Sequence, residues 1–328
     1  MIKSVILVSV ISFLITLVIL PWLIRYLKKI ELFVIDQNKE DKPLVPISGG
    51  LAVTAGILAA FMGWIFAKTF FQQLNSDAHI IIFAVLVSLL TVSFVGFIDD
   101  VLIKKSREGS YGLKQWQKPL LTLIAAAPLV AVKAGTTVIT VPFYGSFDVG
   151  IFYPLILVPI GFIGATNMVN LLAGFNGSEA GMGLIYTGML GLYAYVNGSY
   201  VAALLAFATF SSLLVFFYYN KYPAKILPGD SLTYLLGAVI ASIAIVGNIE
   251  KAALIASIPF IIEFFLKMRT KFKAQSYGFY KDGKVQSKYD KIYSIPHILT
   301  RTGKYTEKQV TMFMILVQLF FSSLIWVF

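Results

Sequence analysis

The sequence predicts an all-α polytopic membrane protein with about ten transmembrane helices, on three observations. Of its 328 residues, 58% are hydrophobic and only 13% are charged, whereas soluble proteins carry about a quarter charged residues. Apolar runs of roughly 20 residues recur along the chain, and each is long enough to cross a hydrocarbon core about 30 Å thick. The breaks between the runs hold most of the Lys and Arg residues, as the loops of membrane proteins do. The absence of Cys excludes disulfides and thiolate metal sites.

The apolar runs give the order of the expected spans in a single membrane domain, residues 1–328. The first run has no small-residue cleavage site and ends in Arg25, Lys28 and Lys29, so we expect a retained span and not a signal peptide. The expected spans cover about residues 2–27, 47–67, 78–102, 118–134, 151–173, 179–197, 199–219, 230–248, 250–268 and 307–328.

Two segments outside the spans have a predicted structure or role. Residues 136–149 alternate β-branched and aromatic residues around Tyr144 and Gly145, which predicts a small hairpin on the surface opposite the charged loops. Residues 269–306 form the largest polar insertion, and we expect them to make a cytoplasmic loop that covers the substrate.

Positive charge sets the expected orientation in the membrane. The net charge is +11, and 27 residues are Lys or Arg. All but Lys3, Lys68, Lys133 and Lys251 fall in the first, third, seventh and ninth loops. Because loops rich in Lys and Arg stay in the cytoplasm, we expect these loops inside and both termini outside. Topology and attraction to anionic lipids explain this bias; a cytoplasmic basin for a polyanionic substrate is the sharper alternative.

The few acidic residues at membrane depth fall on the expected cytoplasmic side. Asp99 and Asp100 end the third span, where they oppose the helix dipole and repel each other. Such a pair is unfavourable unless cations or Mg²⁺ offset it, and a solvated helix end is the alternative. Asp230 opens the eighth span as either a helix cap or a site residue. Lys118 stands where the headgroup of an amphiphile would lie, with snorkelling as the alternative.

Amides follow in the stretch TNMVNLLAGFNGSEAGMG, which begins at Thr166. Asn167 and Asn170 share one helical face, and we expect Asn167 to contact the substrate. An amide oxygen suits a hard cation, although Asn side chains also form hydrogen bonds between membrane helices. Glu179 opens the next helix, where capping and ligand contact are both open. An acid, an amide and substrate phosphates at one site suit Mg²⁺, with Mn²⁺ as an alternative ion.

The first and ninth loops supply candidate contacts to a sugar nucleotide. In the first loop, Asp36, Asn38 and Lys39 are candidates for contact with the nucleotide. In the ninth loop, we expect His297 and Arg301 to reach a diphosphate, and Arg301 is the better candidate because a guanidinium binds phosphate oxygens in pairs. The alternative is that these two side chains are surface groups without a ligand.

These motifs resemble those of the polyprenyl-phosphate N-acetylhexosamine-1-phosphate transferases, and most closely the eukaryotic and archaeal branch that joins GlcNAc-1-phosphate to dolichyl phosphate. GFIDDVL resembles the family's Asp-Asp motif, TNMVNLLAGFNGSEAG its amide-rich stretch, and PAKILPGDSLTY its GD motif. Residues 296–301 resemble the His/Arg motif of the last cytoplasmic loop. The four motifs occur in order, and the resemblance covers nearly the whole chain.

The resemblance implies roles for the matching residues, and two positions depart from the family pattern. Ala173 and Asn176 stand where bacterial members have two aspartates, which favours the eukaryotic and archaeal branch. His297 and Arg301 are separated by three apolar or neutral residues, which leaves open how the diphosphate is held; Lys residues of the same loop are candidates. The implied roles are metal ligands for Asn170 and Asp230, sugar-nucleotide contact for Asn176, lipid-phosphate contact for Lys118, diphosphate contact for Arg301 and the paired aspartates for Asp99 and Asp100.

The implied reaction is transfer of an N-acetylhexosamine-1-phosphate, with GlcNAc favoured, from a UDP-sugar to a polyprenyl or dolichyl phosphate. It yields a lipid-diphosphate-sugar and UMP at the cytoplasmic face, as the first step of lipid-linked glycan assembly. We expect Asp99 and Asp100 to organise the metal and the attacking phosphate. A general-base role is the alternative, because a phosphate monoester is already largely dianionic at neutral pH.

A transporter or flippase for a phosphorylated glycolipid is the rival interpretation, since polar residues inside a membrane also line pathways. The chain shows no internal repeat of the kind found in transporters, and its polar residues gather on one face and not at the midplane. We expect an archaeal plasma membrane before the endoplasmic reticulum, membrane lipids as neighbours, and no nucleic-acid partner. A homodimer is left open.

Overall fold

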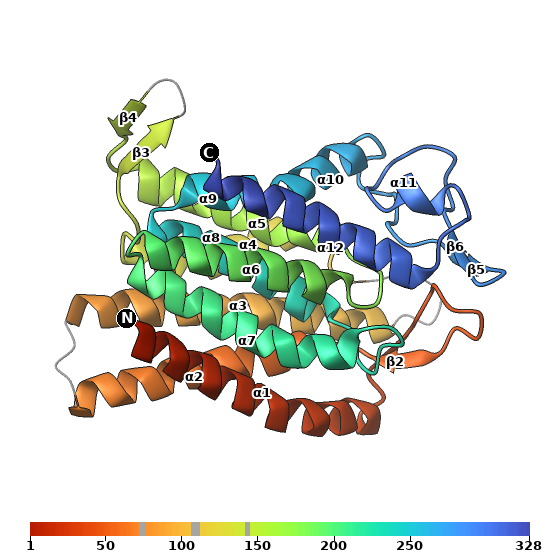
Figure 1. The fold of residues 1–328 in the computed structure, drawn as a ribbon, viewed down its shortest axis with the longest axis horizontal. Coiled ribbons are helices and arrows are strands. Elements are labelled where there is room, and N and C mark those ends of the chain that lie inside the picture. The colour runs from red at the N-terminus through yellow and green to blue at the C-terminus, as the bar shows by residue number, and fades with distance from the viewer. Residues whose placement is uncertain (72–75, 106–111, 142–144) are drawn as a thin grey trace.

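The computed structural model is a bundle of helices that run roughly side by side, with small strands at both ends (Figure 1). It describes residues 1–328 apart from 72–75, 106–111 and 142–144. The helices are α1 (Ile2–Lys29), α2 (Gly50–Phe71), α3 (Ser76–Lys105), α4 (Gln117–Ala131), α5 (Val158–Leu171), α6 (Ser178–Val196), α7 (Tyr200–Asn220), α8 (Gly229–Gly247), α9 (Glu250–Ala256), α10 (Ile258–Met268), α11 (His297–Thr300) and α12 (Glu307–Ser323). A π-helix, Tyr153–Leu157, leads into α5, and a 3₁₀ turn, Leu324–Trp326, follows α12.

Seven described helices are long and apolar enough to cross a membrane, as expected of an integral membrane protein. The predicted number of ten spans is not confirmed. These seven are Ile2–Lys29, Gly50–Phe71, Ala78–Ile103, Tyr153–Leu171, Tyr200–Asn220, Gly229–Gly247 and Glu307–Trp326. Helix α4 is apolar but shorter. The single helix predicted over residues 250–268 is wrong, because the chain breaks at Ser257 into α9 and α10. Pro259 lies in the first turn of α10, and a Pro cannot donate to the preceding turn.

Three antiparallel two-stranded sheets lie outside the helices. They are β1 (Phe33–Ile35) with β2 (Leu44–Pro46), β3 (Val138–Val141) with β4 (Gly145–Asp148), and β5 (Phe279–Lys281) with β6 (Lys284–Gln286).

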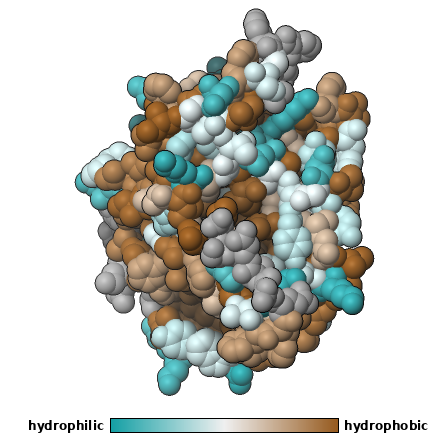
Figure 2. Space-filling view, turned by 90° about the vertical axis from the view of Figure 1, so that its left-hand side faces the viewer, coloured by the Kyte–Doolittle hydropathy of each residue, from teal (hydrophilic) through white to brown (hydrophobic). Residues whose placement is uncertain are grey.

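The β3–β4 pair confirms the predicted hairpin. Val138 pairs with Asp148 and Val141 with Gly145, while Tyr144 of the predicted turn lies outside the described residues. The hairpin stands at one end of the bundle and both chain termini lie toward it, whereas β1–β2 and β5–β6 stand at the other end (Figure 1). On the hairpin end, hydrophilic side chains are scattered among hydrophobic ones (Figure 2). The opposite end carries the loops that we expected to be charged.

Helix α8 is the most deeply buried of the spans, and it positions the site. It packs against α2, α3, α5 and α7, and most of its residues are buried, whereas α1 is largely exposed. The approach of α3 to α8 depends on Gly96, because a Cβ there would lie 2.3 Å from the backbone oxygen of Asp230. A small residue on α3 therefore brings the carboxylates at the end of that helix next to the first turn of α8.

Candidate active site

Asp100 on α3 binds the backbone at the start of α8. The N–H groups of Asp230 and Ser231 donate to its Oδ1 and Oδ2 at 2.8 and 3.3 Å, and the Ser48 hydroxyl donates to Oδ2 at 2.7 Å. A carboxylate there satisfies N–H groups that have no partner inside the helix and is favoured by the dipole. Gly229 has a φ of +68°, and a Cβ on it would lie 2.3 Å from Asp100 Oδ2. Asp100 is fully buried and fixes where α8 begins; a direct part in catalysis stays a prediction.

Asp99 faces the opposite way and meets a cation. Its Oδ2 lies 2.7 Å from Lys118 Nζ, and its Oδ1 accepts from the N–H of Leu113 at 2.6 Å. The same Nζ lies 3.0 Å from Asp230 Oδ2. Snorkelling alone is thus the wrong interpretation of Lys118, because its ammonium stands between two carboxylates of other helices. The cation also offsets the repulsion between Asp99 and Asp230.

Asn170 brings α5 into the same group. Its Nδ2 donates to Asp230 Oδ2 at 3.2 Å, and its Oδ1 accepts from the Thr233 hydroxyl at 2.9 Å. Rotation of the amide by 180° exchanges its oxygen and nitrogen, and Thr233 can accept as well as donate. With the amide rotated in this way, the oxygens of Asn170 and Asp230 would face each other and could both bind a hard cation.

The oxygen atoms at this position suit a Mg²⁺ that keeps several of its waters, and not a metal ion that is surrounded by protein ligands alone. Among the described residues, no three His, Asp or Glu side chains stand close enough to hold a metal. Mg²⁺ keeps several waters and is commonly held by one or two protein oxygens together with substrate phosphates. Asp230 and Asn170 supply such a pair, and the Asp230 side chain is partly open to solvent.

Asn167, one turn before Asn170, is used differently. Its Nδ2 donates to the Thr122 hydroxyl on α4 at 3.0 Å and to the Ile163 carbonyl at 2.9 Å. Of the two roles left open by the sequence, the structure shows the hydrogen bond between helices. A substrate contact by Asn167 stays a prediction.

The first loop is bound to the amide-rich stretch through Asn38. Its Nδ2 donates to the Gly174 carbonyl at 2.7 Å, and its Oδ1 accepts from the N–H of Gly278 at 3.3 Å. Three segments far apart in sequence meet at this one buried side chain, namely the first loop, the stretch after α5 and the ninth loop. A nucleotide contact by Asn38 stays a prediction.

Asn176 is held by the first loop and by α12. Its Nδ2 donates to Asp36 Oδ2 at 2.9 Å, and its N–H donates to Glu307 Oε1 at 2.8 Å. Lys39 lies between the same two acids, 3.0 Å from Asp36 and in contact with Glu307. All four side chains are buried. Glu307 was not among the predicted site residues; its sequence signal is the TEKQ pattern of a capping box, which says nothing of this contact.

Glu179 forms hydrogen bonds at the junction of α6 and the loop that precedes it. Its Oε1 accepts from the N–H of Gly174 at 2.8 Å, and its Oε2 accepts from the Ser178 hydroxyl at 2.7 Å. Helix α6 has no side-chain cap, so these bonds hold the preceding loop instead, and a ligand contact by Glu179 stays a prediction.

His297 and Arg301 lie at the two ends of α11 and differ in exposure. His297 is fully buried; its Nδ1 accepts from the N–H of Tyr293 at 3.2 Å and its Nε2 lies 3.0 Å from the Gln275 carbonyl. Burial lowers the pKa of His297, and a neutral ring with its proton on Nε2 satisfies both bonds. The diphosphate contact expected for His297 is at odds with these bonds. Arg301 is exposed and open to an anion.

Glu263 and Lys267 hold the ninth loop in place, and neither residue was predicted from the sequence. Glu263 Oε1 accepts from the Ser294 hydroxyl at 2.6 Å, and Oε2 accepts from the N–H of Ile295 at 2.8 Å. Lys267 donates to the carbonyl of Leu171, the residue after Asn170. The available signal was an acid inside an apolar helix with a Lys four residues later.

The four residues that meet at the start of α8 lie inside one matched region. Residues 81–248 match glycosyl transferase family 4, and this range includes Asp99, Lys118, Asn170 and Asp230. The chain belongs to this family. The matched region therefore contains the helices that carry these four residues.

Named relatives extend the similarity to almost the whole chain. A Saccharolobus solfataricus protein with the provisional name UDP-N-acetylglucosamine–dolichyl-phosphate N-acetylglucosaminephosphotransferase is 36% identical over 321 residues, 94% of this chain and 92% of its own. A Sulfolobus acidocaldarius protein with the same provisional name is 32% identical over 97% of this chain and 94% of its own. The phospho-N-acetylmuramoyl-pentapeptide-transferase of Lactiplantibacillus plantarum is 34% identical over 77% and 78%. The predicted resemblance is confirmed.

Proposed function

We propose that this protein transfers GlcNAc-1-phosphate from UDP-GlcNAc to dolichyl phosphate or a related polyprenyl phosphate. A phosphate oxygen of the lipid forms a bond to the β-phosphorus of the UDP-sugar, the bond from that phosphorus to the UMP oxygen breaks, and UMP leaves. One phosphoanhydride replaces another, so the reaction is close to reversible. The names of the two archaeal relatives support this substrate pair.

The observation that carries the proposal is the group formed by Asp99, Lys118, Asn170 and Asp230. Phosphoryl transfer requires mainly positioning and compensation of charge. Lys118 supplies a fixed cation at 2.7 and 3.0 Å from its two carboxylates, and about a quarter of its side chain is exposed. It is therefore available to the phosphate of the acceptor lipid.

The surface of α4 suits the apolar chain of that lipid. Leu120, Leu123 and Ile124 follow Lys118 along the helix and are exposed. A phosphate bound at Lys118 leaves its chain beside this apolar surface, in the hydrocarbon of the membrane. The acceptor thus reaches the site from within the bilayer.

Asp230 and Asn170 would hold Mg²⁺, which neutralises charge on the diphosphate when bound. Mn²⁺ is the alternative ion. Asp99 orients Lys118, and Asp100 holds the backbone of Asp230. A strong general base is not required, because the attacking phosphate is already largely dianionic at neutral pH.

We infer that the site faces the cytoplasm of an archaeal plasma membrane, with the endoplasmic reticulum as the less favoured alternative. Strand β2 of the first loop and strands β5 and β6 of the ninth loop stand at the end of the bundle away from the termini (Figure 1), and Lys-rich loops remain in the cytoplasm. Because the chain has no Cys, a single Cys at position 301 or 133 can be labelled selectively with an impermeant maleimide in sealed vesicles. Labelling of position 301 from the outside of cells would show that the orientation is the opposite of the one inferred.

The experiment that tests the reaction uses purified protein, Mg²⁺, dolichyl phosphate and UDP-GlcNAc labelled in the sugar. We expect label in the organic phase and UMP in equal amount, and no label when the lipid is omitted. Parallel reactions with other UDP-N-acetylhexosamines determine the sugar. Absence of labelled lipid with every UDP-sugar would contradict the proposal and favour a transporter.

A further inference from the structure

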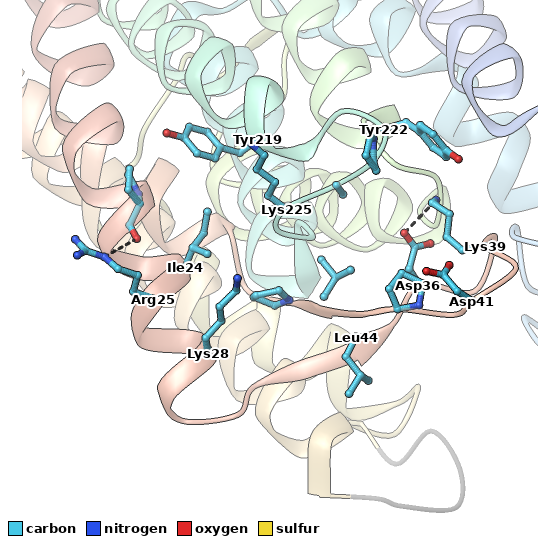
Figure 3. A pocket seen from close by; sticks show the side chains of 16 residues that line it. Ile24, Arg25, Lys28, Asp36, Lys39, Asp41, Leu44, Tyr219, Tyr222 and Lys225 are labelled. Carbon is cyan, nitrogen blue, oxygen red and sulfur yellow. Dashed lines mark hydrogen bonds and ion pairs between the residues drawn. The ribbon is translucent and has the colours of Figure 1, made fainter.

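A cavity lies between the end of α1, strand β2 and the loop from α7 to α8. Its volume is about 700 Å³. None of Asp99, Lys118 and Asp230 lines it. One end of the cavity carries cations from α1 and from the α7–α8 loop, and the other carries the acidic side of the first loop (Figure 3).

The cations at the α1 end are Arg25, Lys28 and Lys225, and they are exposed. None of them forms an ion pair with a described acidic residue. Arg25 Nε donates to the Pro21 carbonyl at 3.4 Å, and Lys225 Nζ lies 5.7 Å from the centre of the Tyr219 ring. Three cations at one end of the cavity, with the acids Asp36 and Asp41 at the other end, create a local positive potential that favours an anionic ligand.

Two aromatic residues show the membrane depth of these cations. Trp22 and Tyr26 are exposed on α1, and their rings stack at 5.5 Å with an interplanar angle of 9°. Trp and Tyr gather at the level of the lipid headgroups. Arg25 and Lys28 lie on the same turns of α1, so their charges stand at headgroup depth.

The apolar residues of the cavity lie beside the side of α1 that is exposed to the membrane. Ile24 and Leu44 line it, and the exposed side of α1 continues toward the hydrocarbon with Leu14 and Val18. A ligand with a charged head at Lys28 and an apolar tail along α1 would match both surfaces. A free anion would use only the first of them.

We propose that this cavity binds the phosphate headgroup of an anionic membrane lipid. Arg25, Lys28 and Lys225 contact the phosphodiester, and the acyl or isoprenoid chains lie along α1. Basic pockets between membrane helices on the cytoplasmic side bind anionic headgroups in this manner. The ligand is a constitutive lipid of the bilayer and not the acceptor, whose phosphate is expected at Lys118. The lipid would also stabilise the first loop, because Asp36 and Lys39 line the far end of the cavity.

The test measures binding of short-chain phosphatidylglycerol to the purified protein by native mass spectrometry, with phosphatidylcholine and inorganic phosphate as the other probes. The triple variant Arg25→Gln, Lys28→Gln, Lys225→Gln removes the cations. Its matched control, Lys29→Gln, Lys271→Gln, Lys273→Gln, removes the same charge from exposed positions that do not line the cavity. We expect roughly fivefold weaker binding per cation and on the order of a hundredfold for all three, with the control within about twofold of the unchanged protein.

Three results would overturn the proposal. An equal loss of lipid binding in the control variant would show that binding depends on the overall surface charge and not on the cavity. Equal binding of phosphatidylcholine would show that the charge is not recognised. Full displacement of the lipid by inorganic phosphate would show a site for free anions. Where the triple variant fails to fold, Lys28→Gln against its neighbour Lys29→Gln gives the same comparison with one charge.

Discussion

Two clusters of charged residues in this protein have the same arrangement of charges and different surroundings. In each, one Lys stands between two carboxylates that come from different segments of the chain. The Lys118 cluster joins Lys118 to Asp99 and Asp230, and the Lys39 cluster joins Lys39 to Asp36 and Glu307.

The clusters differ in their access to solvent. The side chains of Lys118 and Asp230 are 24% and 18% exposed, whereas those of Lys39 and Glu307 are 9% and 2% exposed. An ammonium and a carboxylate that keep some surface can exchange partners with a phosphate or a cation. A closed pair can only hold its segments together. The same charges therefore form a group that is accessible to ligands at the start of α8 and a closed contact between the first loop and α12.

Asp230→Asn should give the largest effect on the reaction and a small effect on the fold. The variant keeps the backbone N–H that Asp100 binds but loses a negative charge needed for a cation. We expect transfer of labelled GlcNAc-1-phosphate to fall by about a thousandfold, as for loss of a principal electrostatic group. Size-exclusion elution and the melting temperature should stay close to those of the unchanged protein. Substantial residual transfer would remove Asp230 from the metal site.

Lys39→Met should show the reverse pattern. Removal of one partner from a buried pair leaves an uncompensated charge and costs about 3 kcal/mol or more. We expect a clearly lower melting temperature and only a few-fold change in transfer by the protein that remains folded. A raised KM for UDP-GlcNAc with an unchanged melting temperature would instead make Lys39 a nucleotide contact, as the sequence first indicated.

Asn170→Ala sharpens the assignment of the Lys118 cluster. Loss of the amide oxygen should weaken Mg²⁺ binding by about tenfold, the lower end of the effect of altered metal surroundings. The measurement is the rise in melting temperature with increasing Mg²⁺, compared with the matched variant Asn167→Ala, whose amide bonds to α4. Equal Mg²⁺ dependence in the two variants would contradict a metal role for Asn170.

His297 gives the smallest expected effect, which appears only in mild acid. Burial holds the pKa of His297 below its ordinary value of 6.5. The unfolded chain therefore binds more protons than the folded protein as the pH falls through about 6.5, and the free energy of unfolding decreases there. We expect His297→Asn to flatten the loss of melting temperature between about pH 7 and pH 5. A slope unchanged by the substitution would show that the ring does not titrate differently on folding.

The sequence was sufficient to predict that Asp99, Asn170 and Asp230 lie on one side of the membrane, because each stands at the same expected end of an apolar run. It did not predict that Lys118 stands between Asp99 and Asp230. The positions of the helices followed from the same runs. A break such as that at Ser257, where both flanks remain apolar, produces no change in the hydrophobic pattern.

The rest depends on contacts that no local pattern records. Lys39 and Glu307 are 268 residues apart, and Glu263 reaches the ninth loop only after α10 has turned it inward. Asp100 looked like a second catalytic acid because it adjoins Asp99. Successive positions of a helix point in different directions, and only the packing of α3 on α8 shows which carboxylate meets Lys118 and which meets the backbone.

The bond from Asp100 to the N–H of Asp230 has a consequence for how position 230 can be altered. A backbone N–H is present whatever side chain the residue carries, Pro excepted. The place of residue 230 is therefore set by α3 and is independent of the identity of the residue itself. Any set of substitutions at this position reports on chemistry at a fixed point in space, so ligands other than carboxylate can be installed there and compared on one scaffold.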